Sequence, residues 1–94
     1  METEQLFGKR LRILRADKGI SQQRVANEIG VTKVGYQNYE YGRKMPSFGR
    51  VPKLAAYFNV STDYLFGLTD EPHPYPPSKH MQEAEEKEEE PKKE

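Results

Sequence analysis

The sequence predicts an all-α fold, with a compact head of five short helices over residues 1–70 and a proline-rich linker and acidic tail over residues 71–94. Apolar side chains recur every three or four residues through the head, and no stretch shows the strict alternation of a half-buried strand. Capping residues and glycines separate these apolar stretches at short intervals. After Asp70 the composition changes to proline and glutamate, which leaves few apolar side chains to build a core.

Each predicted helix has its own start or stop signal. We expect helices at about residues 4–17, 22–29, 32–41 and 51–58, and within the stretch STDYLFG at residues 61–67. The N-caps are Ser21, Thr32 and Ser61, whose hydroxyl oxygens can accept a hydrogen bond from a free amide of the first turn. The stops are Gly19, Gly30 and Gly42. The fourth helix starts near Val51, because Pro52 lacks an amide proton and is tolerated in a first turn.

The net charge of zero hides an asymmetry between the two parts of the chain. Residues 1–70 hold 11 Lys/Arg and 7 Asp/Glu, a net charge of +4, whereas residues 71–94 hold 4 and 8, a net charge of −4. The basic head indicates a polyanionic partner, although a solvated surface with a chance excess of charge fits equally well.

The connection between the second and third helices is the most specific feature of the head. Only residues 30–32 separate the two helices, which forces a steep crossing of the kind found in a helix-turn-helix unit. Such a unit needs a small residue where the helices touch, here Ala26, and a turn residue that tolerates positive φ, here Gly30. The apolar wedge between the helices consists of Val25, Ile29, Val31, Tyr36 and Tyr39. An ordinary helical hairpin is the alternative.

Most of the head consists of two stretches, FGKRLRILRADKGISQQRVANEIGVTKVGYQNYEYGRKMPS and then KLAAYFNVSTDYLFG. Together they resemble the lambda-repressor-like, XRE-type helix-turn-helix regulators of bacteria and their phages. The resemblance covers about residues 6–68. It is carried by the SQ that opens the second helix, the alanine and glycine of the turn, YE.G at the end of the third helix, and FNVSTDYL. The resemblance implies a five-helix, sequence-specific DNA-binding domain that is usually dimeric on a two-fold symmetric double-stranded operator, and most often a transcriptional repressor.

One side of the third helix carries a polar stripe. Helical geometry places Val34, Gln37, Asn38 and Tyr41 opposite the tyrosines of the wedge, with Lys33 at the flank. On an isolated helix such a stripe is solvated, but in a helix-turn-helix unit it enters the major groove. The resemblance implies that Lys33, Val34, Gln37 and Asn38 read bases. Gln and Asn suit adenine, Lys suits guanine or phosphate, and Val suits the thymine methyl group.

Four residues around this stripe are expected to contact the DNA backbone. Gln22 opens the second helix, where its side chain and nearby free amides can hold a phosphate, as the resemblance implies. Thr32, Arg43 and Lys44 flank the third helix. The alternatives are a plain helix-start residue at Gln22 and solubilising charges at Arg43 and Lys44.

Two further groups are expected to serve stability and assembly. The resemblance implies a partly buried, structural ion pair between Arg15 and Glu40 that joins the first and third helices. Tyr64, Phe66 and Leu68 are more apolar than one short helix needs, so part of this set is expected to form a symmetric homodimer contact. A satellite of the monomer core is an equal alternative for them.

The last 24 residues lie outside the resemblance. The stretch EPHPYPPSKH has four prolines in ten residues, and MQEAEEKEEEPKKE has almost no apolar face, so we expect disorder or a frayed helix beyond about Pro72. We favour a solvated spacer; weak competition with DNA for the basic face and docking of another protein are the alternatives.

Several function classes are not expected. Nothing resembles a phosphate-cradling glycine loop, a Ser/Cys–His arrangement or a carboxylate pair, so the chain is not expected to be an enzyme. His73 and His80 are isolated, so neither a metal nor a cofactor is expected, and no small-molecule ligand is evident. The absence of cysteine fits a reducing cytoplasm, and no apolar run approaches the roughly 20 residues that span a membrane. The alternative function is a protein-interaction module on the same scaffold, of antirepressor or antitoxin type.

Overall fold

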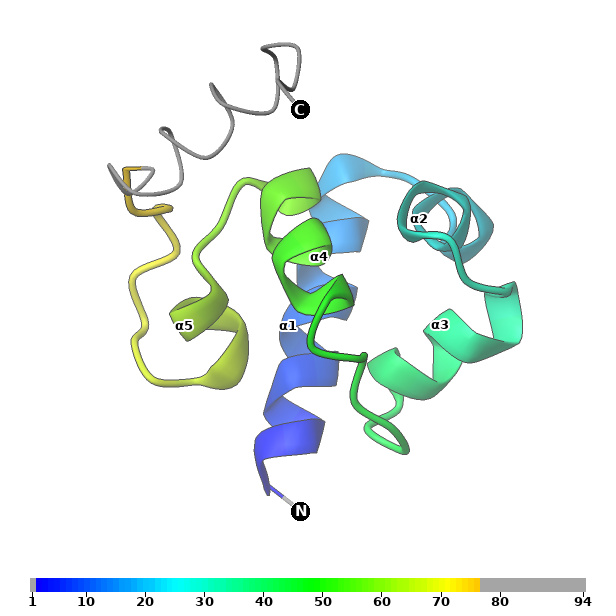
Figure 1. Cartoon of the computed structure of the whole chain (residues 1–94), viewed down its shortest axis with the longest axis horizontal. Coiled ribbons are helices and arrows are strands. Elements are labelled where there is room, and N and C mark those ends of the chain that lie inside the picture. Colours follow the sequence, from blue (N-terminus) through cyan, green and yellow to red (C-terminus); the bar gives the residue numbers. More distant parts are fainter. Residues whose placement is uncertain (1, 77–94) are drawn as a thin grey trace, which may run out of the picture.

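The computed structural model describes residues 2–76 and contains five helices around one core (Figure 1). Their bounds are α1 Glu2–Lys18, α2 Gln22–Ile29, α3 Lys33–Glu40, α4 Arg50–Phe58 and α5 Thr62–Phe66. No strand occurs within these residues, and the all-α prediction is confirmed. The predicted helix ends differ from the observed ones by at most two residues, since the first and last turns of a helix are its least regular parts. None of the helices in residues 2–76 combines the length and the apolar character needed to cross a membrane.

Local signals set three of the helix starts, as predicted. The side-chain oxygens of Ser21, Thr32 and Ser61 accept hydrogen bonds from the amides three residues further along the chain, at 3.1, 3.0 and 3.0 Å. Each bond satisfies one free amide of a first turn, which stabilises a helix by about 1 kcal/mol. Gly30 ends α2 with a φ of +79°, a left-handed conformation that favours glycine.

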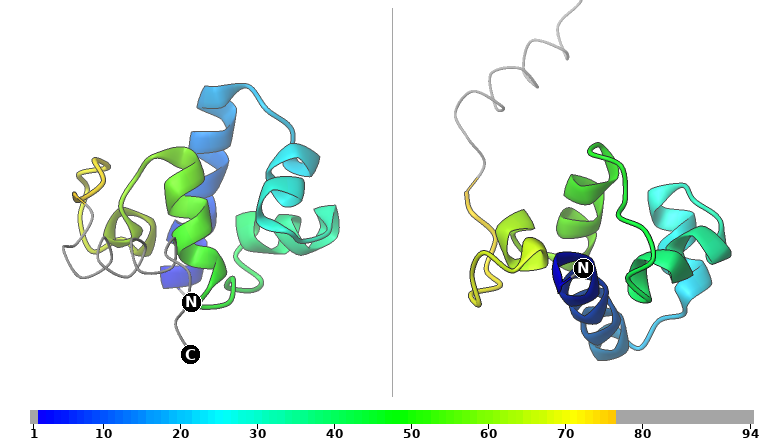
Figure 2. Two further views of the ribbon diagram at one scale, coloured as in Figure 1. Left: turned by 45° about the horizontal axis from the view of Figure 1, so that its top comes forward. Right: turned by 90° about the horizontal axis from the view of Figure 1, so that it is seen from below.

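Every helix contributes buried side chains to the core. α1 packs against α3 and α5, α2 packs against α3 and α4, and α4 packs against α5. The largest fully buried side chains are Tyr36, Phe7, Leu11, Leu54, Leu65 and Val25. Both views in Figure 2 keep α2 and α3 together at one side of the molecule, with α5 at the other side. The helix-turn-helix pair is therefore held by α1 and α4 and lies at an edge of the molecule.

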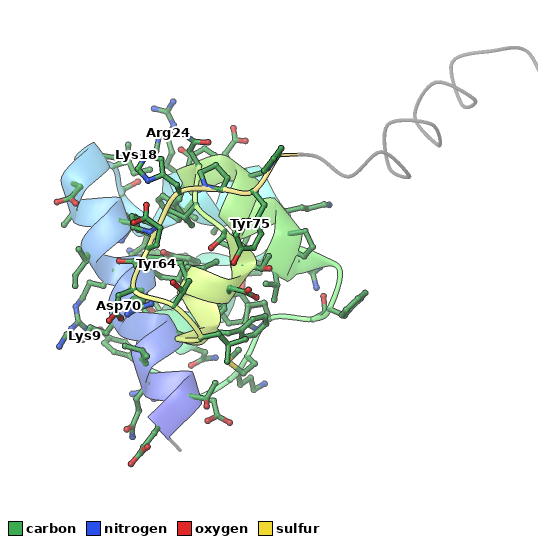
Figure 3. All side chains as sticks on the ribbon, turned by 90° about the vertical axis from the view of Figure 1, so that its left-hand side faces the viewer. Lys9, Lys18, Arg24, Tyr64, Asp70 and Tyr75 are labelled. Carbon is green, nitrogen blue, oxygen red and sulfur yellow. The ribbon has the colours of Figure 1, made fainter. Side chains whose placement is uncertain are left out.

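Residues 69–76, which we call the C-terminal strap, run back over the head without helix or strand. Figure 3 shows the strap leading from Asp70, beside α1, around α5 to Tyr75. At its start, the Arg10 guanidinium donates to the carbonyl oxygen of Thr69 and to the carboxylate of Asp70, each at 2.8 Å. The same guanidinium also donates to the carbonyl oxygen of Tyr64 and lies over its ring, 4.1 Å from the centroid. One arginine of α1 thus joins α5 to the start of the strap.

The far end of the strap is attached to the start of α5. The amide of Ser61 donates to the carbonyl oxygen of Pro72 at 3.0 Å, and the Tyr75 hydroxyl donates to the carboxylate of Asp63 at 3.0 Å. The anchored chain therefore extends past Pro72, where disorder was expected to begin. The expectations for residues 77–94, including His80, lie outside the described residues.

Candidate nucleic-acid interface

The turn between α2 and α3 is closed by two hydrogen bonds to one carbonyl group. The amides of Gly30 and Val31 both donate to the carbonyl oxygen of Ala26, at 2.9 and 3.0 Å. The buried side chains at this crossing are Val25, Ala26, Ile29, Tyr36 and Tyr39, with Val31 partly buried beside them. The predicted wedge is confirmed. It holds one face of α3 against the head and leaves the other face in solvent.

The solvent face of α3 is only partly open. Val34 is 64% exposed and Lys33 is also exposed, so the first turn of the helix presents these side chains freely. Gln37 and Asn38, in the second turn, are half-buried. Tyr41, just after the helix, is 56% exposed. Of the residues predicted to read bases, Lys33 and Val34 in the first turn are therefore the more exposed.

Gly35 lies beside the cap of its own helix. A Cβ atom at this position would stand 3.2 Å from Oγ1 of Thr32 and 3.8 Å from Cβ of Val31. Its amide donates to the same Thr32 oxygen at 3.0 Å. The absent side chain therefore gives room to the capping hydroxyl at the first turn of α3.

A second cluster closes the C-terminal end of α3. The Arg43 guanidinium lies over the ring of Tyr41, 4.8 Å from its centroid, and approaches Oδ1 of Asn38 at 3.5 Å. The amides of Arg43 and Lys44 both donate to the carbonyl oxygen of Asn38, at 2.9 and 3.3 Å. These bonds hold two cations at the negative pole of the helix, where they are stabilised, with Arg43 still offering free N–H donors.

The charge around the two helices is positive. Residues 21–44 contain the cations Arg24, Lys33, Arg43 and Lys44 and the acids Glu28 and Glu40. Glu40 is buried and paired with Arg15, so Glu28 is the acid of this stretch that remains at the surface. A surface of this kind attracts a polyanion.

Both the nitrogen and the oxygen of the Gln22 side-chain amide form hydrogen bonds within the protein. Its Nε2 donates to Oε1 of Glu40 at 3.0 Å, and its Oε1 accepts from Nε2 of Gln37 at 2.9 Å. Gln22 is expected to contact phosphate and Gln37 a base, and the fold joins the two side chains by a hydrogen bond. Nothing in the local sequence pattern indicates this link, because the two residues lie on different helices.

Arg15 and Glu40 form the ion pair that connects α1 to α3. Nε and NH2 of Arg15 donate to the two carboxylate oxygens of Glu40 at 2.6 and 3.2 Å, and NH1 donates to the carbonyl oxygen of Ile20 at 3.0 Å. Burial alone would raise the pKa of Glu40, but hydrogen bonds, first that of Arg15, outweigh it and hold the pKa below its ordinary value. The Tyr36 hydroxyl is buried nearby with no hydrogen-bond partner in the described chain, and burial raises its pKa. Because its pKa is lowered, the Glu40 carboxylate is ionised at neutral pH.

The three residues expected at a dimer contact lie in different environments. Tyr64 lies under the Arg10 guanidinium, and the ring of Phe66 lies 5.7 Å from that of Phe7. Leu68 is 75% exposed. Tyr64 and Phe66 are thus partly engaged by the monomer, and Leu68 is the member of the set that is mostly free.

Phe48 is a surface aromatic residue that sequence analysis did not single out. Its side chain is 95% exposed, in the loop between α3 and α4. It stands beside an open apolar pocket of about 400 Å³ lined by Met45, Pro46, Phe48, Val51, Pro52, Thr62 and Phe66. In the sequence, the signal for it is an aromatic residue between Ser47 and Gly49, within a stretch predicted to be a loop.

Comparison with known proteins supports the geometry. The helix-turn-helix family model HTH_3 matches residues 11–65. The SPbeta prophage-derived uncharacterized HTH-type transcriptional regulator YonR of Bacillus subtilis is 45% identical over 60 residues, which are 64% of this chain and 56% of that protein. The cryptic phage CTXphi transcriptional repressor RstR of Vibrio cholerae is 40% identical over 55 residues, 58% of this chain and 50% of that protein. The chain thus spans about half the length of these two relatives.

A solved structure has the same arrangement of helices. The restriction-modification controller protein C.AhdI from Aeromonas hydrophila superposes with a TM-score of 0.64 at 32% identity, covering 70% of this chain and all of that one. The likeness extends beyond the two-helix motif to most of the head.

Proposed function

The chain belongs to the HTH_3 helix-turn-helix family, and from that premise we propose that it is a sequence-specific regulator of transcription that binds double-stranded DNA. The observation that carries the proposal is the solvent face of α3, which presents Lys33 and Val34 at its first turn and two cations at its far end. A helix held in this way fits the major groove, and its first turn approaches the base edges. We propose that it represses transcription, which is supported by its similarity to RstR, a transcriptional repressor.

The contacts divide between bases and backbone. Lys33 can donate to guanine, Val34 can contact a thymine methyl group, and Asn38 can hydrogen-bond to a base beside them. The flanking groups hold the phosphates and set the position of α3 in the groove; they are Gln22, Thr32, Arg43 and Lys44. Such binding takes place in the cytoplasm, where bacterial and phage DNA lies.

Two copies bind one operator. The surface that supports this is the apolar pocket between the α3–α4 loop, α4 and α5, with the exposed Phe48 in its lining. An exposed apolar side chain next to an apolar pocket can enter the same pocket of a second copy. Such a surface is complementary to itself, as a two-fold symmetric contact requires. Two half-sites about one helical turn apart follow from such a dimer.

The proposal is tested by selecting bound duplexes from a random pool. We expect two related half-sites about 10 base pairs apart, with an affinity that falls with salt by a log–log slope of about −0.9 for each phosphate neutralised. Lys33→Ala is expected to relax specificity at one base pair, whereas Lys44→Ala weakens all duplexes alike; Lys9→Ala, on α1, is the control. If the wild-type chain retains no duplex at low salt, the chain is not a DNA-binding regulator, and the protein-interaction alternative stands in its place.

A further inference from the structure

A row of hydrogen bonds runs from the buried ion pair to the outer side of α3. Glu40, which is 3% exposed, accepts from Nε of Arg15 at 2.6 Å and from Nε2 of Gln22 at 3.0 Å. Gln22 in turn accepts, through Oε1, from Nε2 of Gln37 at 2.9 Å. The row links the buried carboxylate at the end of α3, through Gln22 of α2, to the half-buried Gln37 side chain of α3.

The chemistry of these groups fixes the direction of every bond in the row. An ionised carboxylate can only accept hydrogen bonds, and Arg15 keeps Glu40 ionised. The amino end of the Gln22 side chain must therefore face Glu40, which leaves its carbonyl end for Gln37. Since that carbonyl oxygen can only accept, the amino end of Gln37 must face Gln22.

We propose that Glu40, acting through Gln22, orients the amide of Gln37 so that this side chain selects adenine over guanine. The inference rests on the proposed DNA-binding function and assigns a base preference to one position of the same surface. Glu40 and Gln22 are positioning residues in this scheme, because neither reads the base itself.

The preference follows from what Gln37 has left to offer. One amide proton is used by Gln22, so Oε1 and the second amide proton remain for a base. Adenine presents a donor, N6, and an acceptor, N7, in the major groove, which match this pair of groups. Guanine presents two acceptors, O6 and N7, so Oε1 would face an acceptor unless Gln37 turned and abandoned Gln22. Discrimination of this kind is about tenfold in affinity.

A glutamine without such a fixed partner has no preferred orientation. Its amide can turn to present its two N–H donors to guanine or its donor and acceptor to adenine. The row of hydrogen bonds thus converts a permissive side chain into a selective one. A carboxylate in the core thereby influences which DNA sequence is bound.

The test measures base preference rather than affinity alone. After selection of an operator with the full wild-type chain, Gln37→Ala identifies the base pair that Gln37 reads, as the position where specificity relaxes. Gln22→Met keeps the length of the side chain but removes both hydrogen bonds. Gln23→Met is the matched control, since Gln23 is exposed and bonds within α2 to Asn27 at 2.9 Å.

We expect the wild-type chain and Gln23→Met to prefer adenine over guanine about tenfold at that position, and Gln22→Met to show less than about a twofold preference. A uniform loss of affinity in Gln22→Met with the adenine preference intact would mean that Gln22 acts only on phosphate, and would overturn the inference. So would a Gln37→Ala variant that relaxes no position. A wild-type chain that binds no duplex would instead contradict the proposed function.

A second measurement uses the wild-type chain alone and needs neither DNA nor any variant. In the NMR spectrum of the free wild-type chain, the side-chain amide protons of Gln22 and Gln37 are expected to exchange with solvent at least tenfold more slowly than those of the exposed Gln5. Equal exchange rates for the three side chains would show that the row is not held in solution, and the inference would fail independently of any operator.

Discussion

Gly8 of α1 lies against the last turn of α3 so closely that a Cβ atom at this position would stand 2.4 Å from the carbonyl oxygen of Glu40. The carbonyl oxygen of Tyr39 lies at the same 2.4 Å. Both are backbone atoms of the helix proposed to read DNA, so they cannot move aside as a flexible side chain would. The absence of a side chain at Gly8 sets how closely α1 and α3 approach.

Gly8→Ala is therefore expected to destabilise the head by about 2–3 kcal/mol, because the two helices must move apart. Thermal unfolding followed by circular dichroism measures this. Gly49→Ala is the matched control, since a Cβ atom there meets nothing within 4 Å and its φ of −73° suits alanine. Equal melting midpoints for Gly8→Ala and the wild type would show that the helices are less tightly apposed than described.

Glu40→Ala is expected to lower the free energy of unfolding by about 3 kcal/mol. The substitution removes the partner of Arg15 and of Gln22 and leaves a guanidinium that is 20% exposed without its carboxylate. Chemical denaturation gives the value, with Glu28→Ala, an exposed acid of α2, as the control. An unchanged midpoint for Glu40→Ala would rule out a structural role for the pair.

The same carboxylate predicts how stability depends on pH. Because the folded-state pKa of Glu40 is lowered, its contribution is fully present above the unfolded pKa of about 4.3 and is lost as the pH falls through the folded pKa. The difference in stability between the wild type and Glu40→Gln is therefore expected to shrink between pH 7 and pH 3. A difference that stays constant across this range would mean that the charge of Glu40 contributes nothing.

The C-terminal strap is expected to stabilise the head. A variant ending at residue 76 keeps Thr69, Asp70, Pro72 and Tyr75 and is the reference for the strap. A variant ending at residue 68 loses all four anchors and is expected to melt at least about 5 °C lower. Identical midpoints for the two shortened chains would show that the strap contributes no stability.

Phe48→Ala is expected to weaken self-association without harming the fold, because the side chain is 95% exposed. Sedimentation at micromolar concentration, free and on a two-half-site duplex, measures the effect, and we expect at least a tenfold rise in the dimer dissociation constant. Ile13→Ala, a 44% exposed apolar residue of α1, is the control. A dimer that is unaffected by Phe48→Ala would place the contact elsewhere, and a wild-type chain that is monomeric on DNA would exclude it.

Local interactions account for what could be predicted of the fold. The caps at Ser21, Thr32 and Ser61 are contacts between residues three apart, and the left-handed turn at Gly30 depends on one residue's own backbone. Short-range rules of this kind can be applied along a chain without knowing how the helices pack. They were sufficient to give the five helices and the crossing of α2 and α3.

Chain-distant contacts account for what could not be predicted. Gln22 and Gln37 are 15 residues apart, and Arg10 and Asp70 are 60 residues apart. Each of these bonds depends on how two elements cross, to within a few tenths of an ångström. The sequence therefore predicts that the whole polar stripe of α3 is free to contact DNA, whereas in the structure Gln37 is hydrogen-bonded to Gln22 and through it to the buried Glu40.

The sequence by itself determined that this chain forms five short helices with a basic helix-turn-helix unit, because periodicity, capping and glycine conformation act within a few residues. Only the tertiary structure decided which polar groups of that unit are free to meet a partner. The buried charge of Glu40 fixes the directions of hydrogen bonds between α2 and α3, and Gly8 fixes the distance between α1 and α3. Both effects arise from packing, which local sequence does not encode.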